Sequence, residues 1–212
     1  DSHGSHYNMT NIYAANPKLV FTEDGKYLSR LPDDYYSSKT FTDKMISFIE
    51  DGRTSGKPFF AFLSYQAPHD PHHVDEPWRS MYQGVYDKGW TYFHRQRFQT
   101  QKELGLLPDG VELAERYWYL PDSDILSPVV RATVGRHMEL YAGMMTNMDY
   151  HIGRLVQYLK DIGEYDNTVI IFFGDNGPEG NNTFDVITGH GLANNIFRAQ
   201  NWSEEHHLNV LG

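Results

Sequence analysis

The sequence predicts an α/β domain with a mostly parallel sheet flanked by helices, and three observations lead to this prediction. Two near-continuous apolar runs of strand length, residues 59–65 and 168–173, lie more than a hundred residues apart. Each run follows a stretch with helical periodicity, and each ends in a polar turn, "APHDP" and "GDNGPEG". Apolar runs of this kind are typical of strands covered on both faces. Helices that alternate with such strands indicate a parallel sheet.

The N-terminal quarter predicts a loop followed by a helix. Residues 1–37 show little periodicity, and Asp24-Gly25 is a turn signal between two half-apolar stretches, which predicts a short hairpin. Residues 37–52 then carry apolar side chains on one helical face, and Gly52 closes the pattern: Phe41, Met45, Phe48 and Ile49.

The segment between the two apolar runs is expected to be mainly helical. Residues 76–83 predict a short helix, and residues 84–128 predict a surface excursion with two more short helices. A long helix is expected over residues 129–162, and Gly163 fits its C-cap. One apolar stripe runs along that helix: Leu140, Met144, Met148, Ile152, Leu155, Leu159 and Ile162. Residues 181–212 form an irregular polar tail, and we interpret 1–212 as a single, partial domain.

Composition narrows the classes of function. The chain has 212 residues, of which 40% are apolar and 22% charged, and its formal net charge is −10. This acidity disfavours a nucleic-acid partner and binding to anionic membranes, and an anionic substrate would need a local positive cluster or a metal ion. The apolar runs are far shorter than the roughly 20 residues of a membrane span. Without cysteine, the chain has no disulfide, thiolate metal site or cysteine nucleophile.

The turn after the second apolar run has the composition of a cation site. Asp175 and Asn176 offer a carboxylate and an amide oxygen, and Gly174 and Gly177 leave room for close backbone approach. Hard cations such as Ca²⁺ and Mg²⁺ prefer oxygen ligands of this kind. The alternative is a strand-ending Asx turn, in which the same side chains cap their own backbone.

The turn after the first apolar run places His69 between Pro68 and Pro71. A histidine there can donate a hydrogen bond to an anionic oxygen or act as a general acid near neutral pH, and the alternative is an ordinary loop histidine. His69, His72 and His73 do not have the spacing of a helical zinc site, so zinc is disfavoured. If the two strands are parallel, both turns lie at one sheet edge and share one crevice.

The two turns, in this order and with this helix between them, resemble the sulfatase family of the alkaline phosphatase superfamily. The closest matching segments are "KPFFAFLSYQAPHDP" and "YAGMMTNMDYHIGRLVQYLKDIGEYDNTVIIFFGDNGPEG", and looser ones are "LPDDYYSSKTFTDKMISFIED" and "YQGVYDKGW". The resemblance implies that Asp175 and Asn176 are ligands of a catalytic divalent cation, usually Ca²⁺. It also implies that His69 is a catalytic and substrate-binding residue, which contacts the sulfate ester near the bond that breaks.

The same resemblance shows what the sequence does not contain. The family attacks sulfur with a formylglycine made from a C/S-x-P-S-R motif, and neither that motif nor the family's paired N-terminal aspartates is present. We therefore expect an internal fragment of a sulfatase, inactive alone and weak in cation binding, because Ca²⁺ takes roughly 6–8 oxygen ligands.

The expected substrate is a sulfate-ester small molecule or a sulfated glycan. A phosphonate monoester or phosphodiester hydrolase, and a non-catalytic binding domain of the same fold, remain the alternatives. Compartment and oligomeric state are left open, although family members are commonly periplasmic or secreted.

Overall fold

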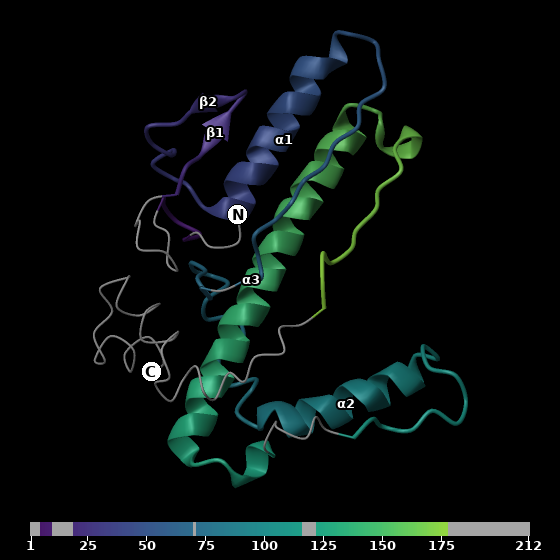
Figure 1. Ribbon diagram of the computed structural model, residues 1–212. Coiled ribbons are helices and arrows are strands. Elements are labelled where there is room, and N and C mark those ends of the chain that lie inside the picture. The colour runs from purple at the N-terminus through teal and green to yellow at the C-terminus, as the bar shows by residue number, and fades with distance from the viewer. Residues whose placement is uncertain (1–4, 10–18, 70, 116–121, 178–212) are drawn as a thin grey trace.

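Two helices that lie side by side form the centre of the fold, α1 (Ser37–Arg53) and α3 (Pro128–Asp161) (Figure 1). This computed structural model describes residues 5–9, 19–69, 71–115 and 122–177. A third helix, α2 (Gly89–Glu103), lies near the first turns of α3, and two 3-10 helices, η1 (Ser123–Ile125) and η2 (Tyr165–Asn167), flank α3 in sequence. The helices predicted over 37–52 and 129–162 are thus confirmed to within a residue at each end. None of the helices in these ranges is both long and apolar enough to cross a membrane.

The predicted hairpin is also present before α1. Strand β1 (Thr22–Glu23) pairs with β2 (Lys26–Tyr27) in antiparallel register, Thr22 opposite Tyr27. The two turn residues have positive φ angles, 49° at Asp24 and 74° at Gly25. Positive φ at both central positions is the geometry that favours Asp-Gly in two-residue hairpin turns.

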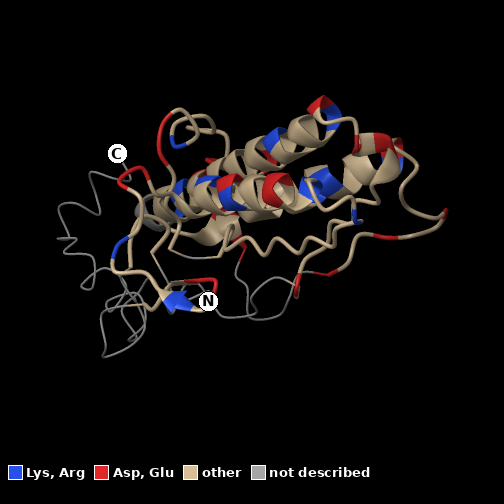
Figure 2. Cartoon of the chain, turned by 90° about the horizontal axis from the view of Figure 1, so that it is seen from above, with Lys and Arg blue, Asp and Glu red and all other residues tan. Residues whose placement is uncertain are grey.

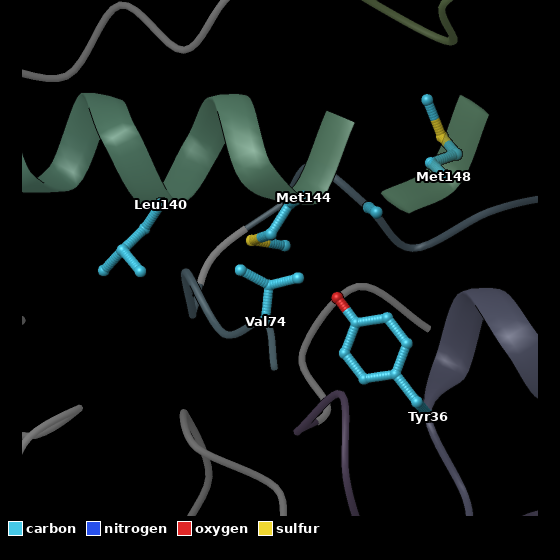
Figure 3. Packing of buried hydrophobic residues seen from close by; sticks show 6 residues of the cluster. Tyr36, Val74, Leu140, Met144 and Met148 are labelled. Carbon is cyan, nitrogen blue, oxygen red and sulfur yellow. The ribbon is translucent and has the colours of Figure 1, made fainter. Parts of the chain in front are cut away.

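The core lies where α3 meets the segments on either side of α1. Met144, which has no exposed surface, lies above Val74 in Figure 3, and Leu140 and Met148 flank it on the same face of α3. The Tyr36 ring points from the start of α1 toward this cluster. The stripe predicted from the periodicity of α3 is therefore the face that is buried, because three of its members carry the core.

Charged side chains join α1 to α3 beside this core, and Figure 2 shows acidic and basic residues interspersed along the helices. Arg154 Nη2 lies 2.6 Å from Asp43 Oδ1. Burial raises the pKa of the Asp43 carboxyl, but hydrogen bonds from Lys39 and Arg154 outweigh this effect and leave the pKa below its ordinary value. Burial, together with the Arg154 charge, lowers the pKa of His151 to about 4, so its imidazole is neutral.

The segment between the core and α2 differs from its prediction. Residues 76–88 form consecutive turns instead of the short helix expected over 76–83. Its backbone bonds are mostly of the i+3 type, as from Met81 N–H to the Trp78 carbonyl, and Gly84 has a φ of 75° that a helix does not allow. In the described part of the predicted excursion, 84–128, α2 is the one α-helix and η1 is a 3-10 helix. The tail predicted over 181–212 lies outside the described residues.

The two apolar runs do not form the predicted strands. Residues 59–65 and 168–173 are extended but pair with no other strand in the described ranges, whose sheet is the antiparallel β1–β2 pair alone. The prediction that they are buried is wrong here, since Phe60 is 94% and Val169 87% exposed. A strand is buried only when other strands and helices cover it. The mostly parallel sheet therefore stays a prediction.

Candidate functional site

His69 lies in a tight turn that follows the first extended run. Its backbone N–H donates to the Gln66 carbonyl at 2.9 Å, which closes the turn over Ala67 and Pro68. The turn therefore has its own local hydrogen bond, and a second set of contacts determines where it lies on the helices.

The carbonyl of His69 accepts a hydrogen bond from a residue near the N-terminus. His6 Nε2 lies 3.0 Å from this oxygen, while His6 Nδ1 lies 2.7 Å from Ser37 Oγ, at the first residue of α1. Because a carbonyl only accepts, Nε2 donates to the His69 oxygen, and Nδ1 forms a hydrogen bond with the Ser37 hydroxyl. The His6 side chain has no exposed surface. His6 thus connects the start of α1 to the histidine turn, and sequence patterns had given no signal for this role.

Two tyrosines hold the segment that continues from this turn. Tyr36 donates its hydroxyl to the His73 carbonyl at 2.8 Å, and Tyr7 donates to Asp75 Oδ1 at 3.0 Å. Burial, and then the nearby Asp75 carboxylate, raise the pKa of both phenols, so both remain protonated donors. The histidine turn and the residues after it are thus fixed at three points.

Replacing His6 tests this anchoring. We expect His6→Phe to lower the free energy of unfolding by about 1–3 kcal/mol, because the His69 carbonyl and the buried Ser37 hydroxyl lose their partner. Urea unfolding measures the loss, and the side-chain NMR signals of His69 should shift as the turn moves. His94→Phe on α2 is the matched control and should change neither. Unchanged NMR signals of the His69 side chain in His6→Phe would show that the turn keeps its position without the hydrogen bond from His6.

The second predicted turn lies at the surface after the other extended run. Asp175 Oδ1 accepts the N–H of Asn176 at 3.0 Å, and Asn176 Nδ2 donates to the Gly177 carbonyl at 2.7 Å. A Cβ at Gly174 would lie 3.2 Å from the Asn176 carbonyl oxygen, so glycine suits the close approach there. Within the described ranges Asp175 Oδ2 and Asn176 Oδ1 accept no hydrogen bond, and both residues are exposed. Local capping of the Asx kind and free oxygen ligands therefore coexist in this turn.

The two turns follow chain segments that run in the same direction. In Figure 1 the blue segment after α1 and the yellow-green segment after α3 both start at the C-terminal end of the preceding helix. Both then run back in the direction of its N-terminal end. Residues of the described ranges form no cluster of three His, Cys, Asp or Glu side chains suited to a metal ion. The shared crevice for His69, Asp175 and Asn176 stays a prediction.

The neighbouring histidines have other surroundings. His72 Nδ1 lies 3.5 Å from Nδ1 of His137 on α3, and the His72 ring is edge-on to Tyr141, with 5.8 Å between the ring centroids. The His73 ring is edge-on to His6 at 6.5 Å. The His72 ring thus packs against α3, whereas the His73 ring packs against the N-terminal segment, where it also lies 5.7 Å from the Tyr7 ring.

Comparisons with known proteins place the chain in a family. The Sulfatase family profile matches residues 2–210. An arylsulfatase of Klebsiella aerogenes is 35% identical over 161 residues, which are 74% of this chain and 33% of the relative. An uncharacterized sulfatase of Schizosaccharomyces pombe is 37% identical over 153 residues, 69% of this chain and 26% of the relative. A multifunctional alkaline phosphatase superfamily protein of Trinickia caryophylli is 28% identical over 152 residues, 71% of this chain and 29% of the relative.

The match over nearly the whole chain defines the class of protein, one with the α/β fold of the alkaline phosphatase type. This chain belongs to the sulfatase family. It spans about a quarter to a third of the length of the curated relatives that it matches.

Proposed function

We propose that this chain serves the metal-dependent hydrolysis of sulfate esters, as the part of a sulfatase that carries a histidine for the substrate and two ligands for a cation. The observation that supports the proposal most directly is the exposed Asp175–Asn176 turn at the end of an extended apolar segment, in a chain of the sulfatase family. The similarity to an arylsulfatase supports the substrate class.

The chemistry of the turn fits a hard cation. In this turn, Asp175 Oδ2 and Asn176 Oδ1 accept no hydrogen bond from the described residues, and both belong to exposed residues. Calcium prefers such oxygens at roughly 2.3–2.6 Å and takes about 6–8 of them. Two ligands make a partial site, so the chain alone should hold the ion weakly.

His69 would act on the substrate side of the same site. Its imidazole would donate a hydrogen bond to an ester or sulfate oxygen and stabilise the charge that develops there. His6 holds the backbone of His69 and thereby sets the direction from which the imidazole approaches. A bound divalent cation would supply Lewis-acid polarisation of the sulfate group. The nucleophile expected in the family is formylglycine, whose motif this sequence does not contain.

The exposed apolar runs support a role within a larger catalytic unit. Five side chains of these runs are each more than two-thirds exposed: Phe60, Phe62, Val169, Ile171 and Phe172. Contiguous apolar surface on this scale marks a place where other protein packs. We propose that further strands of an alkaline-phosphatase-like sheet cover these runs.

The substrate class is tested by turnover of an aryl sulfate and of the matched aryl phosphonate monoester by the protein at its natural length. We expect the sulfate ester to have the higher kcat/KM, and a chelator to abolish its turnover until Ca²⁺ is added back. The 212-residue chain alone should show no turnover. Activity that survives exhaustive chelation would exclude metal dependence.

A phosphonate monoester or phosphodiester is the second candidate substrate, because sulfate and phosphate esters both present tetrahedral anions. The similarity to a multifunctional alkaline phosphatase superfamily protein favours it. A higher kcat/KM for the phosphonate would select this candidate, and no turnover of either ester at natural length would indicate a binding domain.

A further inference from the structure

A hollow lined by polar side chains lies between the start of α2 and the start of α3. Its volume is about 260 Å³, and five residues line it: Lys88, Tyr92, Arg95, Asp124 and Arg131. It shares no residue with the proposed sulfatase site. Pockets that enclose drug-sized ligands measure roughly 300–1,000 Å³, so this hollow suits one small group rather than a large molecule.

Positive charge dominates the lining. Lys88, Arg95 and Arg131 contribute three cations against the single carboxylate of Asp124. None of the three cations forms an ion pair with any residue of the described ranges. Three like charges that line one hollow with a single carboxylate among them repel one another, and in a chain with a net charge of −10 such a cluster is a local exception.

Two of the three cations, Lys88 and Arg131, are held in position by contacts that leave their charge uncompensated. Lys88 Nζ lies 4.4 Å from the centroid of the Tyr92 ring, a cation–π contact that orients the ammonium group. Arg131 Nη2 donates to the Asp124 carbonyl at 2.9 Å, which is a neutral acceptor, while its Nε is buried and has no acceptor in the described ranges. Arg95 is exposed at the rim.

Hydrogen bonds and close packing fix the backbone around the hollow. Thr91 and Ser123 exchange hydrogen bonds between backbone N–H and hydroxyl groups, at 3.1 and 3.2 Å, and so join α2 to η1. Gly89 has a φ of 72°, and a Cβ there would lie 2.5 Å from the Ser123 side chain. The residues that carry the cations are therefore prearranged, which lowers the ordering cost of binding.

We propose that this hollow binds a sulfate group, either as the free ion or as a sulfate ester. Guanidinium groups bind such tetrahedral oxyanions through paired hydrogen bonds, and an ammonium group adds a point charge. The bound anion offsets the repulsion among the three cations. The site would hold a second anionic group at a distinct place on the protein.

The experiment uses the chain in a His69→Ala background, so that sulfate at the proposed catalytic histidine does not contribute. Inorganic sulfate, glucose 6-sulfate and neutral glucose are titrated at low, constant ionic strength, followed by calorimetry and by the arginine Nε–H NMR signals. Arg95→Gln removes a cation from the lining. Arg97→Gln, an exposed arginine on the same helix outside the lining, is the matched control.

We expect saturable binding that Arg95→Gln weakens about tenfold and that Arg97→Gln changes by less than about twofold. Equal affinity for sulfate and glucose 6-sulfate would assign the free ion, and tighter binding of glucose 6-sulfate would assign a sulfated sugar. Equal weakening by the two substitutions would overturn the proposal, because it would reflect net charge alone. Absence of saturation at millimolar concentrations, or equal binding of glucose, would overturn it as well.

Discussion

Substituting Asp175 by alanine should lower kcat/KM for a sulfate ester by about 10²–10³-fold in the protein at its natural length. Of the two proposed ligands Asp175 alone is charged, since Asn176 contributes a neutral amide. Lewis-acid stabilisation by a bound cation is worth several kcal/mol, and each 1.36 kcal/mol corresponds to about a tenfold change in rate. Steady-state kinetics with an aryl sulfate measures the loss.

Three observations separate this loss from damage to the fold. Asp166→Ala removes another exposed carboxylate, in η2, and should leave turnover unchanged within about twofold. A raised Ca²⁺ concentration should restore part of the activity of Asp175→Ala, because the weakened site still has its other ligands. Asp175→Ala and the unsubstituted protein should have the same unfolding midpoint, since the hydrogen bond of Asp175 within the described ranges is a local one with Asn176. Full activity of Asp175→Ala would remove this turn from the catalytic site.

Gly143→Ala on α3 should destabilise the chain by about 1–3 kcal/mol, although alanine is the better helix former. A Cβ at position 143 would lie 2.5 Å from the Trp78 carbonyl oxygen and 3.2 Å from Val74 Cγ1. The carbonyl belongs to backbone that crosses α3 at this point, so relief requires the loop to move away from the core. Urea unfolding followed by circular dichroism measures the change.

The same helix provides the control for this substitution. Gly153 is exposed, and a Cβ there would meet no atom within 4 Å. Gly153→Ala should therefore stabilise the chain by about 0.5–1 kcal/mol through helix propensity alone. The two glycine substitutions should thus have opposite signs. Stabilisation by both would show that the loop carrying Trp78 does not lie against α3 in solution.

The helices could be predicted from sequence because their information is local. The stripe containing Leu140, Met144 and Met148 repeats at helical spacing, and tertiary packing then buries the face that it marks. The Asp24-Gly25 hairpin was equally local, since the turn needs only two residues that tolerate positive φ. The two long helices and the hairpin were therefore predicted correctly, whereas the short helix expected over 76–83 was not.

The strands could not be settled in this way. The apolar side chains of residues 59–65 and 168–173 indicate that both runs are suited to burial. They do not indicate which strand would pair with each run, because that partner lies elsewhere in the sequence. The role of His6 was missed for the same reason, because its acceptor is the carbonyl of His69, a group that every residue has. The residues of the candidate site were predicted from their chemistry. The distances between them depend on how the two runs are placed in a sheet, which local sequence does not determine.

The extended runs also have a consequence for the isolated chain in solution. These runs are exposed and rich in aromatic and β-branched side chains, and they have no partner strand in the described ranges. Segments of this composition tend to pair with the edge strands of other molecules. Two molecules can pair their residues 168–173 as intermolecular β-strands without unfolding α1 or α3. Association of this sort grows with protein concentration, and charges placed within the run, as in Ile171→Lys, would keep the molecules apart.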